Sequence, residues 1–156
     1  MKSKKDFQNI KTAVIGTGSM GKNHARIYNE TSNLIFVSDL DEYQGQKIAK
    51  EFGVQYYKDF RDGLNQVDAL SVAVPTENHE AVVRTVTKHG IHVLVEKPLS
   101  NNIVDAESIL LCCESNDLIL SVGHIERYNP VIQKAKDCLM SGIWGDTLGI
   151  TTRRFS

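Results

Sequence analysis

Six short apolar runs, separated by longer stretches with helical periodicity, set the strongest limit on how this 156-residue chain can fold. Most of the runs are continuous rather than alternating, which is typical of strands in a sheet covered by helices on both faces. Strands that alternate with helices predict βαβ units and a parallel sheet. The runs occupy residues 12–15, 34–37, 54–57, 69–74, 92–95 and 118–122.

This pattern predicts an α/β fold with a doubly wound parallel sheet of six strands in the Rossmann order 3-2-1-4-5-6. Asp59 is expected to cap a short helix, and Gly53 and Gly90 to end helices in the left-handed conformation. Helices are expected over residues 19–30, 41–52, 59–65, 77–89, 102–116 and 131–140. In the fourth of these, the stripe expected to pack on the sheet is Ala81, Val82, Thr85, Val86 and His89.

The charge balance limits the partners of the chain. Eighteen basic and 19 acidic residues give a formal net charge of −1, so neither nucleic acid nor a membrane surface is expected as a partner. No apolar run approaches the length that spans a bilayer, and we expect a cytoplasmic protein. The five histidines do not have metal-ligand spacing, so no metal site is expected.

A glycine motif, GxGxxG from Gly16 to Gly21, stands between the first predicted strand and the first predicted helix. Gly16 permits a tight turn, Gly18 lacks the Cβ that would keep a pyrophosphate away, and Gly21 lets the helix approach the sheet. Free N–H groups at the helix start, at Ser19 and Met20, would then bind the phosphates. The motif predicts a dinucleotide site, with a purely structural turn as the alternative.

Asp39 ends the second apolar run, 18 residues after Gly21. A carboxylate there can accept hydrogen bonds from the 2′- and 3′-hydroxyls of an adenosine ribose, and its charge repels a 2′-phosphate. Asp41 adds a second negative charge, and no arginine lies within several residues along the sequence. We therefore predict NAD rather than NADP as the cofactor, with a helix cap as the alternative role of Asp39.

The fourth apolar run ends in Pro75, Thr76 and, three residues further, His79. Pro75 lacks an N–H and so ends the strand. This end of the sheet faces the crevice of a doubly wound fold, which predicts that these side chains lie along the dinucleotide. The alternative is that Thr76 or Asn78 caps the next helix.

The fifth run ends in Glu96, Lys97 and Pro98. Because Lys97 precedes a proline, its backbone is biased to an extended conformation, which would fix the direction of its ammonium group. An ammonium directed into a crevice can bind a reacting hydroxyl or a developing oxyanion, and we predict Lys97 as catalytic. A surface ion pair is the alternative.

Three motifs, in this order and spacing, resemble the N-terminal domain of the Gfo/Idh/MocA family of NAD(P)-dependent sugar oxidoreductases. They are GTGSMGKNH from Gly16, VPTENH from Val74 and EKPLS from Glu96. The resemblance implies that the glycine loop and Asp39 hold the adenosine half of the cofactor, and that Lys97 lies near the nicotinamide and the substrate. The resemblance also places five residues along the cofactor: Pro75, Thr76, His79, Glu96 and Pro98. In the family, the peptide bond between the lysine and the proline of this motif is often cis.

Residues 122–130 are similar to the members of that family that oxidise C3 of UDP-N-acetylglucosamine or of its uronic acid. By that likeness Arg127 and Asn129 approach a sugar or sugar-nucleotide substrate. Pairing of Arg127 with Glu126, or packing at a domain seam, is the alternative.

Family members are typically more than twice this length, and their second half supplies an antiparallel sheet, most of the sugar pocket and an oligomer interface. Its usual Asp-x-Gly-x-His motif does not occur in this sequence. We expect residues 1–123 to form the dinucleotide-binding domain, and residues 124–156 a connecting helix and the first strand of a truncated substrate domain. That strand could pair copies into a homo-oligomer. Little turnover is expected from the chain alone.

Two other classes of function suit parts of this pattern. A nucleotide-binding or partner-binding module would hold the cofactor and catalyse nothing. An S-adenosylmethionine methyltransferase would have an acidic residue just before the first glycine, where Ile15 stands, and would give the Glu96-Lys97-Pro98 segment no role.

Overall fold

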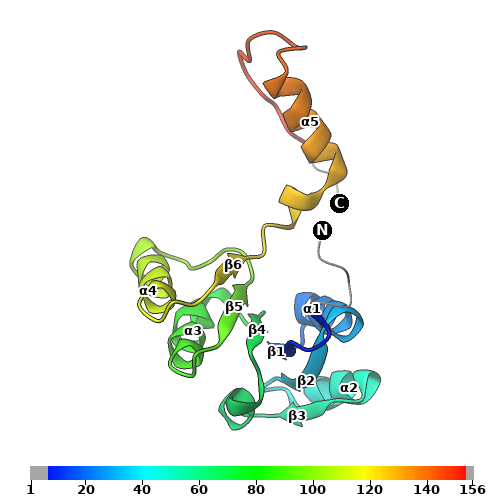
Figure 1. Cartoon of the computed structure of the whole chain (residues 1–156), viewed down its shortest axis with the longest axis vertical. Coiled ribbons are helices and arrows are strands. Elements are labelled where there is room, and N and C mark those ends of the chain that lie inside the picture. The colour runs from blue at the N-terminus through cyan, green and yellow to red at the C-terminus, as the bar shows by residue number, and fades with distance from the viewer. Residues whose placement is uncertain (1–6, 154–156) are drawn as a thin grey trace. The chain divides into compact units, whose positions relative to one another are not determined.

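The computed structural model describes residues 7–153, and these fall into two compact units that divide between Gly123 and His124 (Figure 1). The first unit holds a six-stranded sheet in the order β3-β2-β1-β4-β5-β6, with every neighbouring pair parallel. The predicted fold class and strand order are therefore confirmed. The strands are β1 (Lys11–Ile15), β2 (Asn33–Ser38), β3 (Gln55–Tyr57), β4 (Ala69–Val72), β5 (His92–Val95) and β6 (Leu120–Val122).

Helices cover both faces of this sheet, as the continuous apolar strands require. Val14 of β1 packs in one buried cluster with residues of α1 and α2, while its neighbours Ala13 and Ile15 belong to a second cluster with residues of α3 and α4. Successive side chains of a strand point to opposite faces, so one strand contributes to both cores. The four helices are α1 (Ser19–Thr31), α2 (Glu42–Phe52), α3 (His79–Thr87) and α4 (Ile103–Glu114).

Two shorter segments differ from the predicted helices. The segment after Asp59 is a 3₁₀ helix, η2 (Phe60–Gln66), and Asp59 caps it as predicted by accepting the Arg61 N–H at 3.0 Å. A single 3₁₀ turn, η3 (Thr76–Asn78), precedes α3. The predicted left-handed helix ends are confirmed, with φ of +69° at Gly53 and +71° at Gly90.

The buried face of α3 is not the predicted stripe. Ala81 and His89 are exposed. The face that packs on the core instead follows the spacing i, i+3, i+4, i+7 and i+8 counted from His79, the first residue of the α-helix. These buried positions are His79, Val82, Val83, Val86 and Thr87.

The second unit contains a 3₁₀ turn, η4 (Ile125–Tyr128), and the helix α5 (Pro130–Met140). The predicted strand after this helix is not formed in the described residues 142–153. A strand forms by hydrogen bonding to a neighbouring strand, and residues 124–153 contain none. Residues 154–156 of the expected strand lie outside the described part.

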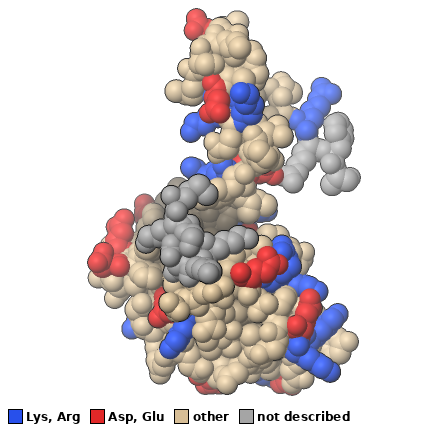
Figure 2. All heavy atoms as spheres, turned by 45° about the vertical axis from the view of Figure 1, so that its right-hand side comes forward, with Lys and Arg blue, Asp and Glu red and all other residues tan. Residues whose placement is uncertain are grey.

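Charges of both signs are interspersed on the face of the molecule seen in Figure 2, in keeping with the net charge of −1. Within residues 7–153, no helix is long and apolar enough to cross a membrane. The same residues contain no cluster of three or more His, Cys, Asp or Glu side chains placed to hold a metal ion.

Candidate functional site

The glycine motif forms the turn between β1 and α1, and two of its glycines are required by the backbone. Gly16 has a φ of +87°, and a Cβ on it would lie 2.6 Å from the carbonyl oxygen of Ala73 on the neighbouring strand end. A Cβ on Gly21 would lie 1.8 Å from the carbonyl oxygen of Gly16. Any side chain at either position would therefore push α1 away from the sheet.

Gly18 has a different environment. Its φ is −62°, and a Cβ on it would have no atom within 4 Å, so the fold itself would accept a side chain here. Gly18 lines a cleft and stands at the N-terminus of α1, where no side chain caps the helix. Ser19 and Met20, the first residues of α1, carry the N–H groups of that end. An uncapped helix start beside an open backbone fits a pyrophosphate group.

Asp39 follows β2 and is hydrogen-bonded to the glycine loop. Its Oδ2 accepts the backbone N–H of Thr17 at 2.7 Å and the Thr17 hydroxyl at 2.8 Å, while its Oδ1 accepts the N–H of Asp41 at 2.9 Å. The N-cap of α2 is Asp41, whose Oδ1 accepts the backbone N–H of Gln44. The alternative role of Asp39 as the helix cap is therefore wrong. A carboxylate has about four acceptor positions, so one remains on Oδ1.

Residues that sequence reasoning missed hold Asp39 in place. Thr17, between the first two glycines, is fully buried. The Tyr56 hydroxyl donates to the carbonyl oxygen of Asp39 at 2.9 Å, and the Gln44 amide donates to the carbonyl oxygen of Thr17 at 3.0 Å. A Cβ on Gly45 would lie 2.2 Å from the Tyr56 ring. The carboxylate is therefore fixed before any ligand arrives.

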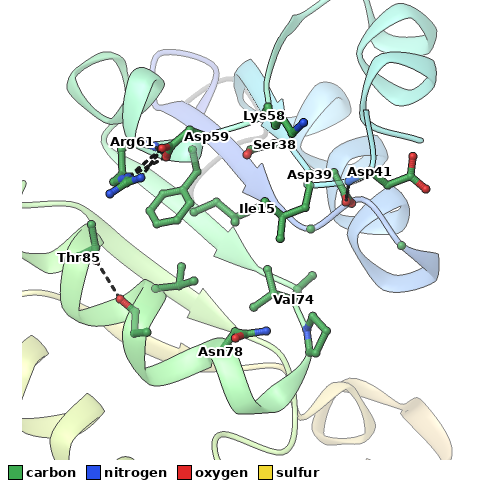
Figure 3. A pocket seen from close by; sticks show the side chains of 18 of the residues that line it. Ile15, Ser38, Asp39, Asp41, Lys58, Asp59, Arg61, Val74, Asn78 and Thr85 are labelled. Carbon is green, nitrogen blue, oxygen red and sulfur yellow. Dashed lines mark hydrogen bonds and ion pairs between the residues drawn. The ribbon is translucent and has the colours of Figure 1, made fainter. Parts of the chain in front are cut away.

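A cleft of about 1190 Å³ opens where β1, β2 and β4 end (Figure 3). Pockets for small molecules in proteins commonly measure about 300–1,000 Å³, so a dinucleotide fragment has room here. Its walls are formed by the glycine loop, by the ends of β2 and β3, and by the side of α3 that carries Ala81, Val82 and Thr85. The lining includes Gly16, Gly18, Asp39, Leu40, Asp41, Lys58, Asp59, Arg61, Asp62, Val74, Pro75, Asn78, Val82 and Thr85.

Two cations in this cleft were not predicted. Lys58 follows β3, and Arg61 lies in the first turn of η2. Both lie far from Asp39 along the sequence, and the order of strands puts the end of β3 beside the end of β2. Their ion pairs are with Glu42 for Lys58 and with Asp59 for Arg61.

The residues after β4 divide into two groups. Pro75 and Asn78 line the cleft, and neither Thr76 nor Asn78 caps a helix with its side chain, so the capping alternative is wrong. His79 is buried, and its two ring nitrogens lie 3.1 Å from the carbonyl oxygen of Leu99 and 3.0 Å from that of Val74. Its ring joins the loop after β4 to the loop after Lys97 and is not part of the cleft lining.

Glu96 is buried in a polar network rather than paired with Lys97 on the surface. Its Oε1 lies 2.9 Å from Nε2 of His24, and its Oε2 accepts the backbone N–H of Lys97 at 3.1 Å. Nδ1 of His24 lies 2.9 Å from the Ser71 hydroxyl, which donates to the Tyr28 hydroxyl at 2.8 Å. Burial raises the pKa of the Tyr28 phenol, so it stays neutral. The network connects α1 and β4 to the end of β5.

Lys97 is exposed two residues beyond β5, and its peptide bond to Pro98 is cis, as the resemblance implies. Its ammonium makes no hydrogen bond or ion pair with another described residue. Only the backbone N–H of Lys97 is held, by Glu96. The ammonium is therefore available to a ligand, at the same edge of the sheet as the glycine loop but outside the lining of the cleft.

Arg127 and Asn129 belong to the second unit. Asn129 caps α5, because its Oδ1 accepts the Val131 N–H at 3.0 Å, and its amide donates to Glu126 at 2.9 Å. Arg127 has an exposed side chain, and its carbonyl oxygen accepts from the Gln133 amide. The side chain of Asn129 is thus occupied by its own helix.

Comparison with known proteins identifies a family and several relatives. The family described as GFO_IDH_MocA, "Oxidoreductase family, NAD-binding Rossmann fold", matches residues 10–124. UDP-N-acetylglucosamine 3-dehydrogenase from Acidithiobacillus ferrooxidans is 33% identical over 124 residues, which are 80% of this chain and 40% of that protein. Its crystal structure superposes with a TM-score of 0.80 over 83% of this chain and 43% of that one.

Other relatives carry different activities. A 2,7-anhydro-N-acetylneuraminate hydratase from Mediterraneibacter gnavus is 30% identical over 87% of this chain and 37% of that protein. The structure of scyllo-inositol dehydrogenase from Lactobacillus casei, with NAD(H) and scyllo-inositol bound, has a TM-score of 0.82 at 25% identity and covers 88% of this chain and 43% of that one. The chain thus spans about 40% of the length of the curated relatives it matches.

Proposed function

The chain belongs to the Gfo/Idh/MocA family of NAD-binding oxidoreductases, and we propose that it is the cofactor-binding part of an enzyme acting on sugars or sugar nucleotides. The reaction is a hydride transfer between a hydroxyl-bearing carbon of the substrate and the nicotinamide ring. C3 of a UDP-N-acetylhexosamine is the candidate position, supported by the 33% identity to a UDP-N-acetylglucosamine 3-dehydrogenase.

The observation that carries this proposal is the open backbone at Gly18 next to a fixed carboxylate. No atom lies within 4 Å of a Cβ on Gly18, although the two flanking glycines of the motif are closely packed. The pyrophosphate would take this space and bind the N-terminus of α1. Oδ1 of Asp39 would accept a hydrogen bond from the adenosine ribose, and the carboxylate charge would disfavour a 2′-phosphate. NAD is therefore the proposed cofactor in preference to NADP.

When bound, NAD supplies the hydride acceptor. Lys97 is the proposed catalytic residue: its ammonium donates a hydrogen bond to the substrate oxygen, and its amine form takes the hydroxyl proton as the carbonyl forms. Glu96 fixes the backbone of Lys97 and so sets the origin of its side chain. Pro98, Pro75 and Thr76 are proposed to lie along the cofactor, and His79 to support that wall through its two carbonyl contacts.

For the substrate, Arg127 is the stronger of the two predicted contacts. Its exposed guanidinium could bind the phosphates of a sugar nucleotide. To bind the substrate, the side chain of Asn129 would have to give up its hydrogen bond to the Val131 N–H at the start of α5. A second candidate reaction is hydration of a sugar derivative, which the 30% identity to a 2,7-anhydro-N-acetylneuraminate hydratase favours.

Isothermal titration calorimetry of the chain with NAD and NADP tests this proposal. We expect NAD to bind more tightly, and Asp39→Ala to erase most of the preference. Asp39→Asn, which keeps an acceptor oxygen for Thr17, controls for loss of the loop geometry and should also reduce the preference. Equal affinities in the unsubstituted chain would refute the role of Asp39, and no heat with either dinucleotide would refute the proposed function.

Substrates are tested on the NAD-loaded chain with UDP-N-acetylglucosamine, scyllo-inositol and 2,7-anhydro-N-acetylneuraminate. Binding of one of these, measured by a further titration, would name the class. We expect negligible NADH formation, because hydride transfer needs the substrate held in line with the nicotinamide. Measurable turnover would show that the chain itself contains a complete substrate site.

A further inference from the structure

Two cations, Lys58 and Arg61, line the cleft that Asp39 also lines. The parallel register pairs Ser38 with Tyr57, so the residues that follow, Asp39 and Lys58, leave neighbouring strands at the same edge. Neighbouring strands are about 4.8 Å apart. Arg61 lines the same cleft (Figure 3). In a Rossmann site, a cation near the adenosine ribose accommodates the 2′-phosphate of NADP. The cleft therefore contains groups suited to NADP beside a carboxylate suited to NAD.

Both cations are already paired with a carboxylate. Nζ of Lys58 lies 2.7 Å from Oε1 of Glu42, the first residue of α2. Nε of Arg61 donates to both carboxylate oxygens of Asp59, at 2.8 and 3.0 Å. Asp59 also accepts the backbone N–H of Arg61 as the cap of η2, which keeps its carboxylate beside the guanidinium. These contacts raise the pKa of Lys58 and of Arg61 and lower that of Asp59 to about 2.

The pairing leaves a negative balance where the ribose would lie. Among the charged side chains that line the cleft, the carboxylates of Asp39, Asp41, Asp59 and Asp62 outnumber Lys58 and Arg61. With each cation neutralised by a partner, a phosphate entering beside Asp39 would meet repulsion from several carboxylates.

We propose that Asp59 and Glu42 are specificity-determining residues that keep this cleft selective for a dinucleotide with a free 2′-hydroxyl. A 2′-phosphate would have to compete with each carboxylate for its cation. The inference rests on the proposed function, because it requires the cofactor ribose to lie beside Asp39. Both pairs are partly exposed, with side chains 39–67% accessible, so solvent screens them and their effect on affinity is moderate.

Asp59→Asn and Glu42→Gln test the two pairs separately. Asparagine is as good a helix cap as aspartate, so Asp59→Asn keeps the cap of η2 and removes only the charge. Asp62→Asn is the matched control, because it removes a carboxylate from the same cleft without releasing a cation from a hydrogen-bonded pair. Thermal unfolding of each variant establishes that it is folded.

The measurement is the Kd of NAD and of NADP for each variant by titration calorimetry. We expect the affinity for NADP to rise about three- to fivefold in Asp59→Asn and in Glu42→Gln, and less than about twofold in Asp62→Asn, a scale set by exposed charge pairs. The affinity for NAD should change less than about threefold. Raising the salt concentration should reduce the gain in NADP affinity, because it screens exposed charges.

Adding Arg61→Gln to Asp59→Asn should abolish the gain, since the guanidinium that binds the phosphate is then gone. If the double variant keeps the gain in NADP affinity, or if Asp62→Asn shows an equal gain, the release of Arg61 is refuted. The gain would then come from the general loss of negative charge. NAD binding with no change in NADP affinity in either variant would refute this inference alone. Failure of the unsubstituted chain to bind NAD would instead refute the proposed function.

Discussion

Replacing Gly18 and Gly21 separately by alanine should separate a glycine that serves the ligand from one that serves the fold. Both belong to the same loop. The new methyl group of Gly18→Ala would have no atom within 4 Å, at a φ of −62° that alanine adopts readily. That of Gly21→Ala would lie 1.8 Å from the carbonyl oxygen of Gly16, a backbone atom that cannot rotate aside.

The expected stability changes differ in size. Gly18→Ala should change the free energy of unfolding by less than about 1 kcal/mol, because the loss of conformational freedom in the unfolded chain is offset by the poorer N-cap that alanine makes for α1. Gly21→Ala should lower it by about 1–3 kcal/mol or more, the cost of forcing extra atoms into a packed region. For a domain of this size each kcal/mol corresponds to roughly 3–5 °C in Tm.

Ligand binding should reverse the ranking. NAD at about 100 times its Kd adds about 2.7 kcal/mol to the stability of a chain that binds it. This shift should almost vanish in Gly18→Ala, because the methyl group occupies the space in which the pyrophosphate approaches the backbone. Gly149→Ala, at another open and exposed glycine, should change neither the Tm nor the NAD shift.

Thermal unfolding followed by circular dichroism, with and without NAD, measures both quantities on the same samples. A loss of stability in Gly18→Ala similar to that in Gly21→Ala would mean that Gly18 also serves the backbone. A stable Gly18→Ala that keeps the full NAD shift would refute the pyrophosphate position.

Two further predictions concern groups outside the glycine loop. His24→Ala leaves the buried Glu96 carboxylate without its partner at 2.9 Å and should lower the free energy of unfolding, measured by urea titration, by about 1–3 kcal/mol. Arg26→Ala, which breaks an exposed ion pair on the same helix, should lower it by less than about 1 kcal/mol. Equal losses would mean that the buried network contributes nothing to stability. Hydrogen bonds from Arg61 lower the pKa of Asp59 from 3.8 to about 2, so the stabilisation by this ionised carboxylate is complete above pH 3.8 and is lost as the pH falls through about 2. The difference in Tm between the chain and Asp59→Asn should shrink over that interval, by an amount that salt reduces, and a constant difference would contradict the ion pair.

The strand order could be predicted because the central strands are apolar on both faces, and right-handed crossovers then leave few topologies. The prediction failed where no such constraint acts. The 3₁₀ turn η3 precedes α3, and the buried face of α3 includes His79, whose ring nitrogens lie within hydrogen-bond distance of two loop carbonyl oxygens that the sequence pattern does not reveal. The described residues after α5 include the apolar Ile143, Trp144, Leu148 and Ile150, but residues 124–153 contain no strand, and a strand cannot form without a partner.

The candidate site divides along the same physical line. Gly16, Gly18 and Asp39 could be predicted because a tight turn, a bound diphosphate and a ribose each require one residue type at a fixed position of the motif. The contacts of His24 with Glu96 and of Lys58 with Glu42 join residues 72 and 16 positions apart, and they depend on which rotamers the packed elements allow. Along the sequence, no arginine stands within several residues of Asp39. The register of β2 and β3 brings Lys58 to the same edge of the sheet, so the proposed selectivity rests on the carboxylates that pair with the cations of the cleft as well as on Asp39.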